Sequence, residues 1–310
     1  MFYLLSFVWL FFHHFRIVFG RYEKMPIPIV CVGNITLGGA GKTPTVIYLV
    51  NYLKKNNIEA HVISRGYGGR FKDTVFVNRK VHNAYDVGDE PLLISRYAKV
   101  WVSKKKKEGI LAAYKAGAQI VLMDDGHQNF SVAKDINILV LDAEVNLKNS
   151  RIFPMGNLRE SPQSAISRAD FLICISSSVS GKKLPESFFR HHSPKIINGE
   201  FKPNISSIFK KRKLVAFCGI GRPEKFFSML RQLNLEIIKE YSFPDHHFYS
   251  KGQLTKILDV AEKSNALVVT TEKDFVKIPT KYKKIIYPLD IQLHLSENKK
   301  LLLELKNLVC

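Results

Sequence analysis

The sequence predicts an α/β protein of two α/β/α domains with mostly parallel sheets, preceded by a hydrophobic helix. Three observations support this fold class. Short apolar runs alternate with segments of helical periodicity, a second alternation of the same kind begins near Leu214, and residues 1–12 are almost entirely apolar. Continuous apolar strands separated by helices are typical of parallel sheets that are covered on both faces.

Residues 1–20 are expected to form a membrane-associated helix. Met1–Phe12 is apolar but shorter than the roughly 20 residues that cross a bilayer. No small-residue cleavage site follows it, which argues against a cleaved signal peptide. An interfacial or shallowly inserted helix, with Trp9 and Arg16 near the headgroups, is the favoured interpretation, and a helix packed on the protein's own core is the alternative.

The first α/β domain is expected over residues 21–205. Strand Ile29–Gly33 leads through a Gly-rich turn into a helix at Pro44–Lys55. The apolar runs that follow are short enough for buried strands. The other expected elements are strands at Ala60–Ser64, Val75–Asn78, Val100–Ser103, Gln119–Met123, Ile136–Leu141 and Phe171–Ile175, and a helix at Glu108–Ala116.

A smaller α/β domain, expected to close over the active site, is assigned to residues 206–310. The boundary lies in the polar, basic segment Lys202–Lys213. The expected elements are strands at Leu214–Cys218, Leu235–Tyr241 and Ala266–Thr270, and helices at Glu224–Leu233, Lys251–Ser264 and Asn298–Val309.

The net charge of +20 fits several partners but selects none. An anionic membrane face, a polyphosphate substrate and nucleic acid would all attract such a chain, and a generally Lys-rich surface is an equal alternative. The basic residues occur in short runs such as Lys104–Lys107, without interleaved aromatic residues, so we expect no nucleic-acid partner. The four cysteines form no CxxC pair, which argues against a zinc site and fits a reducing cytosol.

The turn after strand Ile29–Gly33 predicts a phosphate-binding loop and a P-loop NTPase-like domain. Its residues 36–43 match GxxxxGK[ST], except that Thr36 occupies the first glycine position. Lys42 is expected to reach the β- and γ-phosphates of ATP, and Thr43 to bind Mg²⁺. An ordinary Gly-rich turn is the alternative. The residues expected around the nucleotide are Thr36, Leu37, Gly38, Gly39, Ala40, Gly41, Lys42 and Thr43.

A carboxylate at the end of a neighbouring strand is expected to complete the Mg²⁺ site. Asp124 and Asp125 follow the apolar run Gln119–Met123 and are assigned this role. An aspartate in this position could instead cap the next helix. Together with the phosphate-binding loop, the metal interpretation is favoured.

Three more polar clusters are candidate site segments. Arg65 and Tyr67 follow a strand, where loops at the carboxyl ends of a parallel sheet form the ligand crevice. Asp89 and Glu90 precede a helix and could simply cap it. His246 is followed by a second histidine, but adjacent side chains diverge, so a single histidine paired with a carboxylate is favoured over zinc.

Six segments occur in the order VGNITLGGAGKTP, SRGYGG, VGDEP, MDDGHQNF, FPDHH and VTTEKD. Together they resemble the tetraacyldisaccharide 4'-kinase family of lipid A biosynthesis, and the similarity extends from about Pro26 to about Ile278. The family also has Thr or Ser where Thr36 replaces the first glycine. His127 departs from the family, in which Leu is expected at this position.

The resemblance implies transfer of the ATP γ-phosphate to the 4'-hydroxyl of a tetraacylated glucosamine disaccharide 1-phosphate. This reaction belongs to the cytoplasmic face of the bacterial inner membrane, so a lipid-linked substrate and an anionic membrane surface are the expected partners. No obligate protein partner is evident. By motif correspondence Asp89 is the base that accepts the hydroxyl proton and His246 is its partner.

The remaining roles also follow from the resemblance. Glu90 supports the metal or the base, and Arg159 and Glu160 are further active-site positions on the substrate side. Two other classes compete with a kinase. A membrane-associated P-loop ATPase switch would use the same loop without an acceptor, and a nucleic-acid-binding ATPase is suggested by the charge alone.

Overall fold

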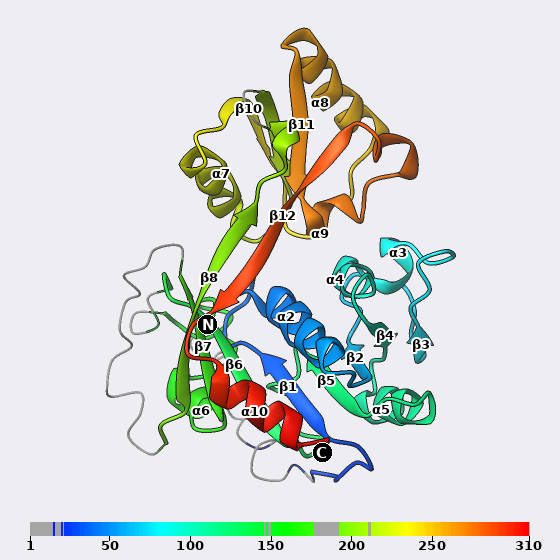
Figure 1. Ribbon diagram of the computed structural model, residues 1–310, viewed down its shortest axis with the longest axis vertical. Helices are drawn as coiled ribbons and strands as arrows, with labels where there is room; N and C mark the ends of the chain where they lie inside the picture. Colours follow the sequence, from blue (N-terminus) through cyan, green and yellow to red (C-terminus); the bar gives the residue numbers. More distant parts are fainter. Residues whose placement is uncertain are drawn as a thin grey trace.

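The computed structural model describes residues 15, 20, 22–145, 147, 150–176, 192–209 and 212–309. In these residues twelve strands form a mixed, mostly parallel sheet flanked by helices (Figure 1). The strands are β1 (Ile29–Gly33), β2 (Ala60–Ser64), β3 (Val75–Phe76), β4 (Lys99–Val102), β5 (Ile120–Asp124), β6 (Ile136–Asp142), β7 (Phe171–Ser176), β8 (Lys195–Asn204), β9 (Lys213–Cys218), β10 (Glu236–Ser242), β11 (Ala266–Thr271) and β12 (Ile286–Leu295). Their order across the sheet is β10-β9-β11-β12-β8-β7-β6-β1-β5-β2-β4-β3.

The helices connect and cover these strands. They are α2 (Lys42–Lys55), α3 (Ala84–Val87), α4 (Asp89–Ile94), α5 (Lys106–Lys115), α6 (Pro162–Ile166), α7 (Pro223–Gln232), α8 (Lys251–Lys263), α9 (Glu272–Phe275) and α10 (Lys299–Asn307), with 3-10 turns η2 (Ser207–Phe209) and η3 (Thr280–Tyr282). Parallel pairing places the carboxyl ends of β1 and β5 at one edge, because Val32 pairs with Asp124. The turn after β1 therefore lies beside the acids that end β5.

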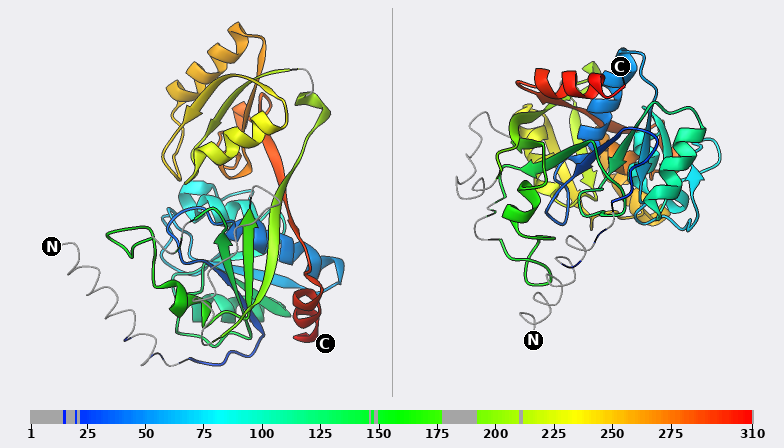
Figure 2. Two further views of the ribbon diagram at one scale, coloured as in Figure 1. Left: turned by 90° about the vertical axis from the view of Figure 1, so that its left-hand side faces the viewer. Right: turned by 90° about the horizontal axis from the view of Figure 1, so that it is seen from below.

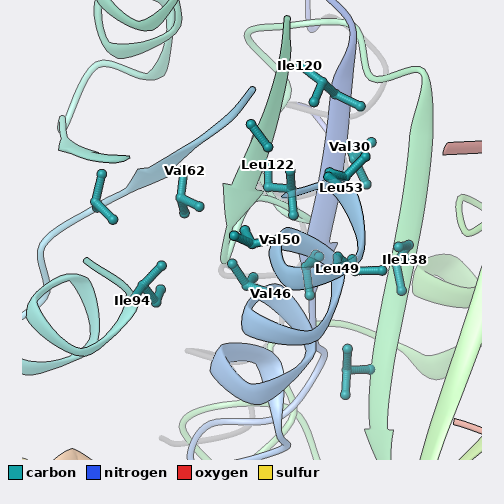
Figure 3. Packing of buried hydrophobic residues seen from close by; sticks show 14 of the residues in the cluster. Val30, Val46, Leu49, Val50, Leu53, Val62, Ile94, Ile120, Leu122 and Ile138 are labelled. Carbon is teal, nitrogen blue, oxygen red and sulfur yellow. The ribbon is translucent and has the colours of Figure 1, made fainter. Parts of the chain in front are cut away.

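Helix α2 anchors the first part of the molecule. Val46, Leu49, Val50 and Leu53 recur at helical spacing and are buried against the apolar side chains of the central strands (Figure 3). The residues that meet them come from β1, β2, β5 and β6, which are buried almost throughout. This packing fixes where α2 begins and so fixes the turn before it.

Two long strands join the first part of the molecule to the second. β8 and β12 pair antiparallel over residues 199–204 and 290–295 (Figures 1 and 2). Beyond them, β9, β10 and β11 pack against α7 and α8 in two further apolar clusters. The chain returns along β12, and Leu301 and Leu305 of α10 join the same core as Leu49.

Every strand and helix range predicted between residues 29 and 309 has a counterpart within two residues at its start, and the α/β class is confirmed. The strands β8 and β12 and the short helices α3, α6 and α9 were not predicted. The division at residues 205 and 206 stays a prediction, although α10 packs on the first part rather than the second. The expected helix of residues 1–20 lies, apart from residues 15 and 20, outside the described residues. Among the helices that the structure describes, none is both long and apolar enough to cross a membrane.

Candidate active site

The turn after β1 has the backbone of a phosphate-binding loop. Gly38 and Gly41 have φ of 100° and 92°, a region that glycine enters without strain. A Cβ on Gly41 would lie 2.4 Å from Cδ1 of Ile175, so the neighbouring strand also excludes a larger residue. The Asn34 side chain donates to the carbonyl oxygen of Thr36 at 2.8 Å and to that of Gly38 at 3.4 Å. These hydrogen bonds stabilise the conformation of the turn.

Thr36 lies in the loop but is buried, and its backbone forms an isolated antiparallel β-bridge with Leu158. Within the described residues, the wall of the large cavity above the loop begins at Leu37 and continues through Thr43. The Gly-rich residues and Lys42 are therefore brought to the cavity as predicted, and Thr36 is not. The cavity has a volume of about 1770 Å³.

Asp124 lies at the end of β5 in the wall of this cavity. Its Oδ2 accepts a hydrogen bond from Ser64 at 3.2 Å, whereas its buried Oδ1 has no partner among the described residues. Burial, together with the neighbouring carboxylates of Glu90 and Asp125, raises the pKa of Asp124 to about 7. The negative charge of Asp124 is therefore poorly compensated by the side chains around it, and binding of a cation would stabilise it.

Asp125 is compensated by two side-chain cations. Arg159 Nη1 lies 2.8 Å from its Oδ1, and Lys42 Nζ lies 3.7 Å from the same atom. Burial alone would raise the pKa of Asp125, but Lys42 and Arg159 hold it below its ordinary value. Asp125 also has a φ of 54°, in the left-handed region that residues other than glycine rarely adopt.

Asp89 and His246 come together from opposite parts of the chain. Nδ1 of His246 lies 2.9 Å from Oδ1 and 3.0 Å from Oδ2 of Asp89. Burial would raise the pKa of Asp89, but the hydrogen bond from His246 and the charges of Lys273 and Lys277 lower it to about 2. Asp89 is therefore ionised at neutral pH, and Nδ1 of His246 donates the hydrogen.

Two lysines near α9 support this pair. Lys277 is fully buried and lies 3.0 Å from Asp274 and 3.4 Å from Asp89. Lys273 lies 3.2 Å from Glu90 and donates to Nε2 of His246 at 3.3 Å. Burial would lower the pKa of Lys273, but the surrounding carboxylates, Glu90 first, raise it above its ordinary value.

The cavity wall brings together most of the predicted substrate residues. Arg65, Tyr67 and Arg159 line it, with Glu90 and His246, and the Tyr67 ring lies 4.9 Å from the His246 ring. Asp89 does not itself line the cavity and is only 3% exposed. In the described part of the chain, no group of three or more His, Cys, Asp or Glu residues is arranged to hold a metal ion.

Glu160, predicted on the substrate side, does not reach the cavity wall that the described residues form. It is fully buried, and Arg168 Nη2 contacts both of its carboxylate oxygens at 2.8 and 2.6 Å. Gln128 donates to the same carboxylate at 3.0 Å and also lies 3.3 Å from Arg159. Glu160 is thus connected to Arg159 through Gln128 and does not line the described cavity.

His127, the departure from the family motif, also lies away from the described cavity wall. It is buried, and its Nε2 lies 3.0 Å from the carbonyl oxygen of Ala165. Burial and the nearby cation of Arg168 lower the pKa of His127 to about 3. It is a neutral packing residue at neutral pH.

Sequence reasoning missed several cations of the site. Lys106 was noted only as part of the basic run Lys104–Lys107, but it is buried and donates to the carbonyl oxygens of Ile63 and Asp124 at 3.3 Å each. Arg222 and Lys225, before and within α7, also line the cavity. Lys273 and Lys277 were not singled out, although Lys273 stands in the segment VTTEKD.

Comparisons with known proteins show which family this chain belongs to. The sequence matches the tetraacyldisaccharide-1-P 4'-kinase family over residues 1–309. A tetraacyldisaccharide 4'-kinase of Parvibaculum lavamentivorans is 41% identical over 265 residues, covering 85% of this chain and 77% of the relative. One of Rhodospirillum rubrum is 41% identical over 257 residues, covering 83% and 78%.

A crystal structure of LpxK from Aquifex aeolicus in complex with ATP superposes on this fold with a TM-score of 0.82. The two sequences are 28% identical, and the match covers 99% of this chain and 98% of the other. Relatedness therefore extends over the whole fold, including both parts that meet at the cavity. The chain belongs to the tetraacyldisaccharide-1-P 4'-kinase family.

Proposed function

We propose that this protein transfers the γ-phosphate of ATP to the 4'-hydroxyl of a tetraacyldisaccharide 1-phosphate, a step of lipid A biosynthesis. One structural observation supports this proposal in addition to family membership. The Gly-rich loop and His246 of the Asp89–His246 pair line the same cavity, so a phosphate donor and a hydroxyl acceptor can meet there. An ATPase switch without an acceptor would not require the pair.

The nucleotide is expected along residues 37–43. Backbone N–H groups of the Gly-rich turn and the N-terminus of α2 provide a site for anionic phosphate oxygens, and Lys42 adds a positive charge. The residues present fit a divalent cation, because Oδ1 of Asp124 is buried without a hydrogen-bond partner among the described residues, and Asp124, Thr43 and Glu90 line the same cavity. Mg²⁺ in nucleotide sites needs only one or two protein carboxylates.

We assign Asp124 as the first carboxylate of the metal site, with Thr43 beside it, and Glu90 and Asp125 in support. Asp125 is paired with Arg159 and Lys42, so it is better placed to hold these two cations near the phosphates. Bound Mg²⁺ would neutralise phosphate charge during transfer. The positively charged side chains of Lys42 and Arg159 would also neutralise phosphate charge.

Asp89 is proposed as the base that takes the proton of the acceptor hydroxyl. Its carboxylate is ionised, and His246 and Lys277 hold it in place. His246 is proposed as its partner, because it orients the Asp89 carboxylate and itself lines the cavity. Because the two residues lie 157 positions apart in the chain, the pair forms only when both parts of the molecule meet.

The acceptor is expected to enter past Arg65, Tyr67 and Arg159. All three line the cavity, and the Tyr67 side chain is 68% exposed. Because the substrate is acylated, we propose that the enzyme works at the cytoplasmic face of the inner membrane, with residues 1–20 and the excess positive charge on its anionic surface. Deletion of residues 1–20 should lower recovery in the membrane fraction, and unchanged fractionation would contradict this role.

The reaction itself is tested by ³²P transfer from γ-labelled ATP to lipid A disaccharide 1-phosphate in detergent micelles. The wild type should produce labelled bisphosphate, and Asp89→Asn should reduce kcat by about a thousandfold. His246→Asn should reduce it by about ten- to a hundredfold if Asp89 is the direct base. ATP hydrolysis without label on the lipid would instead indicate an ATPase switch.

A further inference from the structure

A loop from the second part of the molecule lies directly on the phosphate-binding turn. It joins β9 to α7 through residues 219–222. A Cβ built on Gly221 would lie 3.2 Å from the backbone nitrogen of Gly39 and 3.5 Å from Cα of Gly38. Glycine therefore permits backbone-to-backbone contact between the two segments. The next residue in the chain is Arg222.

A buried carboxylate holds Arg222 at this position. Nη1 of Arg222 lies 2.7 Å from Oδ2 of Asp142, the last residue of β6. Lys225 Nζ lies at the same distance from the same oxygen. Oδ1 of Asp142 accepts the backbone N–H of Glu144 at 3.0 Å, and the aspartate is only 5% exposed. β6 is the strand next to β1, so this anchor stands beside the phosphate-binding turn.

Arg222 and Lys225 differ in the carboxylates that pair with them. Lys225 also lies 3.3 Å from Glu144, whereas among the described residues Asp142 is the acidic partner of Arg222. A guanidinium has five N–H donors, and the contact with Asp142 uses one nitrogen of the group. The Arg222 side chain is 36% exposed and lines the same cavity as residues 37–43. Its remaining donors suit an anion with several oxygens.

We propose that Arg222 is a nucleotide-binding residue that contacts the polyphosphate chain of ATP, and that Asp142 is the residue that positions it. This inference rests on the proposed function in one respect, that ATP is the bound nucleotide. The second part of the molecule then contributes one cation to the phosphates, and the phosphate-binding turn contributes another, Lys42. Planar, forked donors of arginine recognise phosphate oxygens in a fixed orientation.

Calorimetric titration of the full chain with ATP, ADP and AMP tests the proposal, in the presence of Mg²⁺ and without lipid. Arg222→Ala should weaken ATP and ADP binding about ten- to a hundredfold and AMP binding by much less. Arg222→Lys should recover part of the loss. Arg231→Ala is the matched control, because Arg231 lies on α7, the helix that begins directly after Arg222, and is also ion-paired, with Glu224 and Glu240, but does not line the described cavity.

Asp142→Asn tests the positioning role by a double-mutant cycle. It should weaken ATP binding several-fold in the wild type and much less in the Arg222→Ala background, because the carboxylate acts through the guanidinium. Equal losses in both backgrounds would overturn the positioning role. Unchanged ATP affinity in Arg222→Ala, or equal losses for ATP and AMP, would overturn the nucleotide contact.

These outcomes are separate from the kinase reaction. If the wild type binds ATP tightly through Arg222 but leaves the lipid unlabelled, the proposed function fails and the nucleotide contact stands. If the wild type labels the lipid and Arg222→Ala binds ATP normally, only the nucleotide contact fails.

Discussion

Lys277 is a buried cation that compensates two carboxylates, Asp274 and Asp89, at 3.0 and 3.4 Å. Asp274 is itself fully buried and accepts hydrogen bonds from Tyr249, Thr271 and the backbone of Gly219. Lys277→Met should therefore leave uncompensated buried charge and cost about 3 kcal/mol of unfolding free energy, measured by urea denaturation. The exposed Lys284→Met is the control and should be near neutral. Equal stability of both variants would show that the buried lysine is not needed.

His127 should make the fold sensitive to acid. Its pKa is about 3 in the folded protein and near 6.5 in the unfolded chain, so between these values only the unfolded chain binds the proton. The free energy of unfolding therefore falls as pH falls through 6.5, by about 2 kcal/mol between pH 7 and 5. His127→Leu should remove this contribution, and its unfolding free energy should depend less on pH by that amount. Parallel pH profiles of the two proteins would contradict the assignment.

Several of the strands that the sequence predicted share one property: they are apolar enough to be buried on both sides, although β3 and β10, which are largely exposed, were predicted as well. β1, β2 and β5 are buried at every position, and their runs are visible in the sequence. β8 and β12 were missed because buried, intermediate and exposed positions mix along them without a clear period. Their strand structure depends on pairing with each other, which no local pattern reveals.

A substitution of Gly41, the residue before α2, tests how tightly the phosphate-binding turn is packed. Gly41→Ala would combine a φ of 92° with a Cβ placed 2.4 Å from Ile175, so it should lower both stability and ATP affinity, the latter at least tenfold. Gly117→Ala is the matched control, because Gly117 has a φ of 84° and open space around it. It should cost about 1 kcal/mol in backbone strain alone and leave ATP affinity unchanged. Titration with ATP and thermal unfolding of both variants make the comparison.

Residues that line the cavity form contacts with residues far apart in the chain. His246 meets Asp89, Glu272 meets Arg96 at 2.9 Å, and Arg222 meets Asp142. The motifs identified the residues on each part because strand ends and Gly-rich turns have recognisable patterns. The backbone hydrogen bonds of Lys106 and the ion pair of Arg222 could not be predicted, since a charged residue in a polar run looks the same whether it is solvated or buried.

An aromatic contact also joins the two parts, beside the Asp89–His246 pair. Tyr85 of α3 stacks on Phe248 with ring centroids 3.8 Å apart and planes 15° apart, and Phe248 is two residues from His246. Such a pair contributes roughly 1 kcal/mol, and it touches neither the phosphate-binding turn nor the acids of the metal site. Tyr85→Ala should therefore lower kcat/KM for the lipid several-fold by weakening the placement of His246, while the dissociation constant for ATP stays unchanged.

Tyr114→Ala provides the control for this prediction, because Tyr114 is 48% exposed on α5, compared with 59% for Tyr85, and it forms no aromatic pair among the described residues. A double-mutant cycle with Phe248→Ala then isolates the contact itself: the second substitution should add little once the first has removed the stack. If Tyr85→Ala and Phe248→Ala lower kcat/KM independently, each ring acts through its own surroundings and the stack does not connect the two parts. If neither variant changes kcat/KM, the ion pairs alone hold His246 in place.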